Sequence, residues 1–224
     1  MKLFLRRIYL STKSKIDTLN LSDEEYKSIQ HRPGVLEYIN PRLMIMSTLV
    51  YLVPILQREL TRRGIKAENA KVLDAGARDG WTVALFQQLG FTSAEGVELV
   101  DELVEHAQQQ GRKVTQGDVQ KLDGIDANKF DLIFCRHTLE HTMDPALALR
   151  QLVRVCVPEG LIYVSLPLER EAHGKHTTAI PNLRLLKKLA GGEAVDIVEL
   201  RRSSSTGYII PDADEALMIL RKKV

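Results

Sequence analysis

The stretch KVLDAGARDGWTVALFQQLG, residues 71–90, constrains the fold of this 224-residue chain more than any other segment. It opens with a short apolar run around Asp74, which predicts a buried parallel strand. Gly76 and Gly80 follow, and apolar residues then recur at helical spacing as far as Gly90, a residue typical of the position just past a helix end. A strand, a glycine-containing turn and a helix present backbone N–H groups and a positive helix end to a ligand. The segment therefore predicts a ligand-binding turn.

Length and charge narrow the class of protein. A chain of 224 residues holds one sizeable core with an N-terminal extension, and its net charge of +2 creates no global field that would attract nucleic acid, so no nucleic-acid partner is expected. Cys135 and Cys156 both lie in apolar segments and are expected to be unpaired core thiols in a reducing compartment. The longest apolar stretch, residues 43–56, is too short and interrupted to span a bilayer. We therefore expect a soluble, cytoplasmic protein without a transmembrane segment.

Residues 1–70 are predicted to form an N-terminal helical extension. Ser22 and Glu25 have capping-box spacing, and Pro41 is expected to start a longer helix that Pro54 kinks or divides. We expect this extension to pack on the main domain or to lie over its ligand site. The alternative is peripheral contact with a membrane or a partner through its basic residues, which are Lys2, Arg6, Arg7, Lys13 and Lys15.

From residue 71 to residue 224 the pattern alternates between strands and helices. Further strands are predicted at residues 93–99, 112–115, 130–134 and 161–166, and helices at residues 100–110, 146–156 and 182–189. The two closing runs, residues 194–202 and 216–224, alternate in the β manner and are expected to pair. The fold class is therefore α/β: a doubly wound, mostly parallel seven-stranded sheet with an antiparallel last strand.

Ligands of such sheets bind beyond the carboxyl ends of the strands. Asp74, Glu98 and Asp118 follow the first three strands, and residues 136–141 follow the fourth. Glu98 lies about twenty residues after the glycine turn, where an acceptor for ribose hydroxyls belongs. These positions fit a nicotinamide dinucleotide or another adenosine-containing ligand. The spacing of the turn, GARDG, departs from G-x-G-x-x-G, which disfavours the dinucleotide.

Five segments between residues 71 and 167 carry a more specific resemblance. In order, they are VLDAGARDG, EGVEL, QGDVQKL, FDLIFCRHTLEHTMDP and LVRVCVPEGLIYVSLP. Together they resemble the successive motifs of class I S-adenosylmethionine-dependent methyltransferases, most of all the type 11 group that includes quinone-biosynthesis methyltransferases. The resemblance implies a Rossmann-like fold, an S-adenosylmethionine-binding domain over residues 71–224, and methyl transfer to a small-molecule acceptor.

The resemblance also implies roles for individual residues. Asp74 would orient the amino group of the cofactor, and Gly76 would let the backbone approach its methionine moiety. Glu98 would accept hydrogen bonds from both ribose hydroxyls. Asp118 would take the exocyclic amine of adenine, although by itself each aspartate is more simply a helix-cap or turn residue. The complete predicted cofactor-binding set is Asp74, Ala75, Gly76, Gly80, Glu98, Leu99, Asp118, Val119 and Arg136.

Arg78 is a departure from the family pattern, since it stands where a further glycine is usual. A side chain that faced the ligand would place a cation near the cationic sulfonium and weaken binding. The second hypothesis for function is therefore a methyltransferase-fold binding or scaffold protein without catalysis.

The histidines bear on the reaction. Methyl transfer needs chiefly alignment, and it needs a base only when the acceptor is a hydroxyl or a similar group. His141 is the first candidate for a general base and His137 the second, and packing or capping roles fit both histidines equally well. These histidines favour oxygen over nitrogen or carbon as the acceptor atom.

A second group of polar residues follows the fifth strand. Glu169, His173 and His176 are expected on the same side of the sheet as Glu140 and His141, where they could form a carboxylate–imidazole metal site. This group resembles the cluster of some relatives that methylate catechols or RNA ends, but only in part, because those relatives carry an acidic residue at the position of His137. We favour a polar substrate-binding loop, in which His173, Lys175 and His176 contact an anionic or hydroxylated acceptor.

Overall fold

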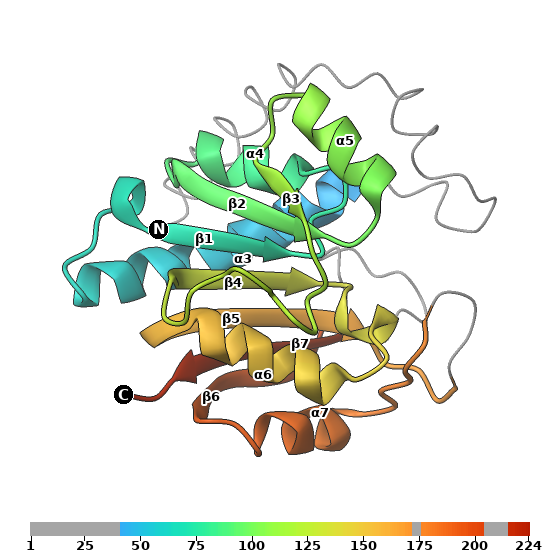
Figure 1. Ribbon diagram of the computed structural model, residues 1–224. Coiled ribbons are helices and arrows are strands. Elements are labelled where there is room, and N and C mark those ends of the chain that lie inside the picture. Colours follow the sequence, from blue (N-terminus) through green and yellow to red (C-terminus); the bar gives the residue numbers. More distant parts are fainter. Residues whose placement is uncertain (1–40, 172–175, 204–214) are drawn as a thin grey trace.

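The computed structural model describes residues 41–171, 176–203 and 215–224 (Figure 1). The predicted capping box and basic segment lie outside this part of the chain. A seven-stranded sheet has the order β3-β2-β1-β4-β5-β7-β6, in which β7 runs antiparallel to both of its neighbours and the remaining pairs are parallel. The predicted fold class is confirmed. The strands are β1 Lys71–Ala75, β2 Ser93–Glu98, β3 Val114–Gln116, β4 Phe130–Arg136, β5 Cys156–Pro167, β6 Val195–Ser203 and β7 Glu215–Lys222.

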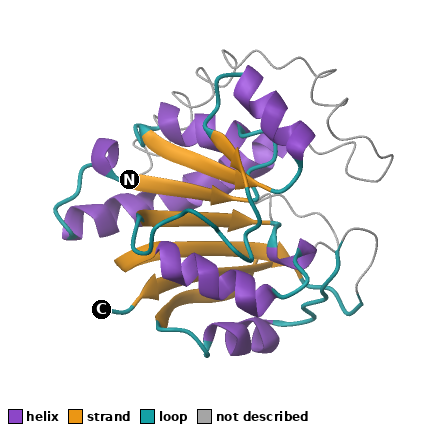
Figure 2. Ribbon diagram, viewed as in Figure 1, coloured by secondary structure: helices purple, strands orange, loops and turns teal. Residues whose placement is uncertain are grey.

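Helices cover both faces of the sheet (Figure 2). They are α3 Pro41–Arg62, α4 Trp81–Gln88, α5 Asp101–Gln109, α6 Pro145–Val155 and α7 Leu183–Ala190, with short 3₁₀ turns η2 Ala67–Asn69 and η3 Leu139–His141. Buried residues of α3, α4 and α5 share one core with one face of the strands, and those of α6 and α7 share a second core with the other face. Both faces of the strands are buried, as the continuous apolar runs of the sequence predict.

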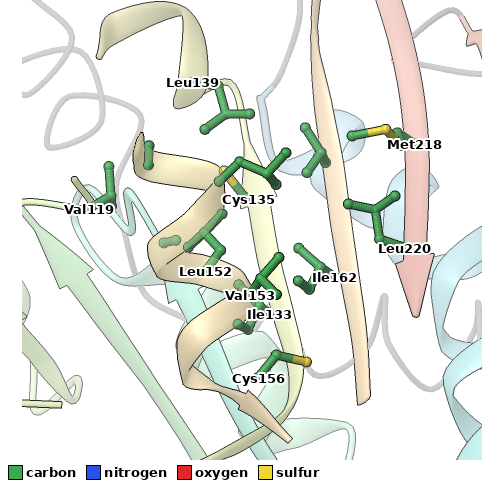
Figure 3. Packing of buried hydrophobic residues seen from close by; sticks show 14 of the residues in the cluster. Val119, Ile133, Cys135, Leu139, Leu152, Val153, Cys156, Ile162, Met218 and Leu220 are labelled. Atoms are coloured by element: carbon green, nitrogen blue, oxygen red, sulfur yellow. The ribbon is translucent and has the colours of Figure 1, made fainter. Parts of the chain in front are cut away.

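The core under α6 shows how alternation along the strands separates the two layers. Ile133 and Cys135 of β4 contribute to this core, whereas Leu132 and Phe134 contribute to the opposite one. Figure 3 shows side chains of α6 packed against those of β4 and β5. Cys135 and Cys156 are free and buried, as predicted, and burial raises the pKa of the Cys156 thiol to about 12. Both cysteines therefore act as small apolar core residues.

Helix α3 is a single helix that continues through Pro54, so the predicted division at this proline is absent. Its buried residues Leu49, Val53 and Leu56 belong to the predicted apolar stripe, and Leu52 is buried with them. They pack in the same core as residues of β5 and β7, which makes this helix a layer of the main domain. The domain division after residue 70 stays a prediction. None of the described helices, α3 included, combines the length and the apolar character needed to cross a membrane.

Two strands begin two or more residues away from the predicted start. β5 begins at Cys156, because Cys156 pairs with Phe130 while Leu161 pairs with Leu132, so that residues 157–160 form a bulge where the sequence predicts a separate turn. β3 begins two residues later than predicted. The Arg112 N–H bonds to the Ala107 carbonyl and closes α5 instead of joining the sheet.

Candidate active site

The carboxyl ends of β1, β2, β4 and β5, with the loops that follow them, are called the carboxyl edge of the sheet. At this edge the turn after β1 contacts the end of β2. The N–H groups of Gly76 and Ala77 both donate to the carbonyl of Val97, at 2.9 and 3.0 Å. Gly76 has φ +82°, and a Cβ atom there would lie 2.7 Å from Cγ2 of Thr138. Both the backbone conformation and the close approach of Thr138 therefore require glycine at this position.

Backbone N–H groups hold the Glu98 carboxylate in place. Its Oε2 accepts from the Arg78 N–H at 2.8 Å, and its Oε1 accepts from the N–H groups of Leu99 and Val100 at 2.8 and 3.0 Å. A carboxylate offers about four acceptor positions, so Glu98 retains acceptor capacity for a ligand hydroxyl. Beside it, Leu99 and Val100 are 62% and 45% exposed, and such apolar side chains suit contact with a flat ring.

Arg78 occupies the left-handed region with φ +50°, and its side chain is exposed. Solvent screens an exposed guanidinium, so its repulsion of a cationic ligand is weak. The residue acts in the turn through its backbone N–H, which bonds to Glu98. Its exposure weakens the argument that Arg78 prevents cofactor binding.

Arg112, two residues before β3, also stabilises the turn after β1. This role was not predicted from the sequence. Its side chain is buried, and Nη1 donates to the carbonyl oxygen of Asp79 at 2.7 Å and to Oδ2 of Asp79 at 3.1 Å. Asp79 in the glycine turn indicates that a basic partner is needed, but nothing in the sequence identifies which of the 31 basic residues pairs with it. The turn is thus fixed by Glu98 on one side and by Arg112 on the other.

Asp74 lies in β1, two residues before Gly76 of the turn, and is only 4% exposed. Burial first, and then the negative charges of Glu98 and Asp79, raise its pKa to about 8 against the opposing effects of Arg136 and a hydrogen bond to Thr82. Asp74 therefore holds a proton at neutral pH. A ligand ammonium group beside it would restore the charged form.

His137 lies between two carboxylates just past the end of β4. Its Nε2 is 2.9 Å from Oε1 of Glu215, and its Nδ1 is 3.3 Å from Oε1 of Glu140. Burial by itself would lower the pKa of His137, but the hydrogen bonds to Glu140 and Glu215 outweigh it and the pKa is raised. An imidazolium held on both nitrogens is a poor proton acceptor.

Several buried polar atoms at this edge find no hydrogen-bond acceptor or donor among the described residues. They are Nε1 of Trp81 at the start of α4, Nη2 of Arg136 and Oε2 of Glu140. Buried polar groups of folded proteins are nearly always hydrogen-bonded, and exceptions mark sites where a ligand, a water molecule or an ion binds. Their gathering around the ends of β1 and β4 points to a polar ligand at this edge.

Glu140, His141 and His176 form a cluster whose ligand atoms all lie within 4.8 Å of one another. The rings of His141 and His176 meet edge to face with centroids 4.8 Å apart, and Oε2 of Glu169 is 2.7 Å from Nδ1 of His176. A carboxylate on one imidazole nitrogen is the arrangement that orients metal-binding histidines. Four residues of the predicted polar cluster thus come together, and these groups could hold a divalent cation. His173 and Lys175 lie outside the described residues.

Asp118 follows β3 and is half-buried. Its Oδ1 accepts from the N–H of Gln120 at 2.8 Å, which closes a turn. Val119 beside it is buried against the α6 core. This geometry is the turn that the sequence predicts as the simpler role of Asp118. The second carboxylate oxygen, Oδ2, accepts from Nε2 of Gln120 at 3.5 Å and lies 4.0 Å from Nζ of Lys121. Gln120 in turn accepts from the N–H of Asp144 and links this loop to the start of α6.

Residues 50–192, more than half of the chain, match the model of a family described as "Methyltransferase domain". The chain belongs to this family. The resemblance to class I S-adenosylmethionine-dependent methyltransferases is thus confirmed, and membership of this family implies S-adenosylmethionine as the cofactor. The donor set fits this cofactor, because the edge offers a carboxylate for ribose hydroxyls at Glu98 and a buried acid for an amine at Asp74.

The sequence identity between this chain and individual relatives is low and covers less than half of the chain. It is 31% identical over 105 residues to a ubiquinone biosynthesis O-methyltransferase of Actinobacillus pleuropneumoniae, a match that covers 42% of this chain and 44% of that protein. The matched part is thus less than half the length of this relative.

Solved structures agree on the fold and differ in chemistry. The [4+2]-cyclase SpnF superposes with a TM-score of 0.59 at 20% identity, covering 69% of this chain and 75% of that chain. The carbon methyltransferase of CurJ superposes with a TM-score of 0.56 at 13% identity, covering 69% and 49%. Since the same fold carries a cyclase and a carbon methyltransferase, the fold by itself decides neither the reaction nor the acceptor atom.

Proposed function

We propose that this protein transfers a methyl group from S-adenosylmethionine to a hydroxyl group of a small molecule. The observation that carries the proposal is the placement of an exposed histidine, His141, beside Glu140 and His176 at the same edge of the sheet as the predicted cofactor residues. When bound, the cofactor supplies a methyl group activated by a positively charged sulfur.

In this proposal the turn after β1 and the end of β2 hold the donor. Asp74 binds the amino group, Glu98 binds the ribose hydroxyls, and the exposed side chain of Leu99 lies against the adenine. The absence of a side chain at Gly76 allows close approach of the methionine moiety. The remaining predicted cofactor contacts are Ala75, Gly80, Asp118, Val119 and Arg136.

A hydroxyl acceptor needs to lose its proton as its oxygen attacks. His141 is the better base, because His137 already binds two carboxylates and has a raised pKa. His176 is oriented by Glu169 and would contact the acceptor next to His141. The match to a ubiquinone biosynthesis O-methyltransferase supports oxygen as the acceptor atom.

The alternative is a binding or scaffold protein that retains the methyltransferase fold without catalysis. SpnF is a cyclase with this fold, so the fold by itself does not establish methyl transfer, and the alternative needs a test. The two hypotheses are separated first by whether S-adenosylmethionine binds and whether Glu98 is required, since absence of binding favours the scaffold protein. Only the first hypothesis predicts transfer. The N-terminal cap, the cytoplasmic location and the peripheral membrane contact through the first residues stay predictions.

The first experiment is calorimetric titration of S-adenosylmethionine into the native protein and into Glu98→Ala, with NAD as a control ligand. We expect micromolar binding of S-adenosylmethionine, weakened at least about tenfold in the variant, which corresponds to about 1.4 kcal/mol. Transfer of a radioactive methyl group to a panel of catechols, phenols and amines then tests the reaction. His141→Gln should lower turnover of the hydroxyl acceptor at least about a hundredfold, whereas His106→Gln on α5 serves as a matched control.

Each outcome separates the hypotheses. Binding without transfer to any acceptor supports the scaffold alternative, and transfer to amines alone refutes the choice of oxygen. Full turnover in His141→Gln would contradict the role of this histidine.

A further inference from the structure

Arg136 is the last residue of β4 and lies on the face of the sheet that α3 covers. It pairs in register with Ser165 of β5, and alternation places its side chain on the same side as Phe134 and Tyr163, which belong to the core under α3. The residue is partly buried, and its Nη2 is fully shielded from solvent. Among the described residues, no side chain or carbonyl accepts a hydrogen bond from Nη2.

A guanidinium is charged at any physiological pH, and a buried N–H donor without an acceptor is costly. None of the nearby acidic groups accepts a hydrogen bond from Nη2. Asp74 is within electrostatic reach but holds a proton at neutral pH, and Glu140 and Glu215 are bound to His137. Among the described residues, Nη2 of Arg136 therefore has no anionic hydrogen-bond acceptor.

The planar fork of a guanidinium matches the two oxygens of a carboxylate, with which it forms paired hydrogen bonds. We infer that Arg136 binds the carboxylate of a ligand at the carboxyl edge of the sheet. The inference rests on the proposed function, since it places this ligand in the methyltransferase site. Two sources supply the same chemistry: the methionine carboxylate of the donor, and a carboxylate on the methyl acceptor.

The first arm of the test addresses the donor. S-adenosylhomocysteine and its decarboxylated analogue, which lacks only the carboxylate, are titrated into the native protein, Arg136→Met and Arg136→Lys. If the donor supplies the carboxylate, Arg136→Met weakens binding of S-adenosylhomocysteine at least tenfold and leaves the analogue unchanged. Arg136→Lys restores part of the affinity, because it keeps the charge without the fork.

The second arm addresses the acceptor. Benzoate and the neutral benzyl alcohol are titrated into the protein saturated with S-adenosylhomocysteine. If the acceptor carries the carboxylate, the native protein binds benzoate in preference to benzyl alcohol, and Arg136→Met loses that preference. Arg184→Met, which removes an exposed arginine of α7, is the control for a general change in charge.

A preference for carboxylate ligands in either arm that is lost in Arg136→Met supports the inference. Equal effects on the carboxylate ligands and on their neutral counterparts, or no effect in either arm, overturn it. A native protein that binds neither adenosine ligand refutes the proposed function instead, and benzoate titrated into the protein alone then tests Arg136 separately. Thermal melts of each variant exclude unfolding as the cause.

Discussion

Asp74→Asn should make this protein more stable at neutral pH while it weakens binding of S-adenosylmethionine. Asp74 is buried, and its pKa is raised to about 8. The folded protein therefore keeps a proton that the unfolded chain releases above pH 4. Because the folded state binds more protons, its stability falls as pH rises toward 8. An asparagine keeps the shape and the hydrogen bond to Thr82 and does not titrate.

The magnitude follows from the two pKa values. Between pH 5 and pH 7 the unfolded aspartate is ionised and the folded one is not, so the native protein loses about 1.4 kcal/mol of stability per pH unit through this group. The stability advantage of Asp74→Asn over the native protein should thus grow by about 2–3 kcal/mol across this range. Below pH 4 the advantage should stay constant, because both states are then protonated.

The measurement is urea unfolding of both proteins at pH 5, 6, 7 and 8, with the difference in unfolding free energy plotted against pH. Asp126→Asn, which removes an exposed carboxylate, controls for the loss of one charge. Its unfolding free energy should change with pH in the same way as that of the native protein. Parallel profiles for Asp74→Asn as well would show that Asp74 is ionised in the folded state and would refute the reasoning. Affinity for S-adenosylhomocysteine should fall at least about tenfold in Asp74→Asn, since the amino group loses its carboxylate.

Three further changes test the carboxyl edge. Gly76→Ala should cost about 2–4 kcal/mol in urea unfolding, because it combines a left-handed backbone with a contact against Thr138, and a loss below about 1 kcal/mol would contradict that account. Arg112→Gln should cost about 3 kcal/mol and weaken S-adenosylmethionine binding, since it leaves Asp79 without its buried partner, whereas the exposed Arg184→Gln should change neither. Titration of Zn²⁺ or Mn²⁺ decides between the metal site and the substrate-binding loop: saturable binding that is about tenfold weaker in Glu169→Gln but unchanged in the control His106→Gln would assign the cluster to a metal. Absence of saturable metal binding would leave His141 to act as a base without a metal.

Patterns local in the chain predicted most of the fold. Helix α6 shows why: Asp144 caps it by accepting from the Leu147 N–H, and Pro145 occupies its first turn. The order of the strand ends likewise placed Asp74, Glu98 and the residues after β4 on one edge. Local rules suffice there, because parallel strands connected by helices bring their carboxyl ends to the same side.

Contacts between distant segments were beyond these rules. His137 meets Glu215 of β7, which lies 78 residues further along the chain, and Arg112 meets Asp79 across 33 residues. Neither pair belongs to a periodic pattern, and each depends on how strands are ordered across the sheet. The bulge at residues 157–160 was also missed, because turn residues in a sequence do not distinguish a loop from an interruption within one strand.

Several groups at the carboxyl edge share one property: each of them costs stability in the protein alone. Asp74 is a buried acid, Arg136 a guanidinium with a buried unpaired N–H, and Arg78 and His137 hold left-handed backbones. Proteins retain destabilising groups of this kind at binding sites, where a bound ligand compensates for the loss of stability. A ligand that supplied an ammonium to Asp74 and a carboxylate to Arg136 would relieve two of these costs at once, and both groups belong to the amino-acid part of S-adenosylmethionine. The protein should therefore be stabilised more by S-adenosylhomocysteine than by adenosine at equal free ligand concentration, since adenosine can satisfy only Glu98 and the ring contacts.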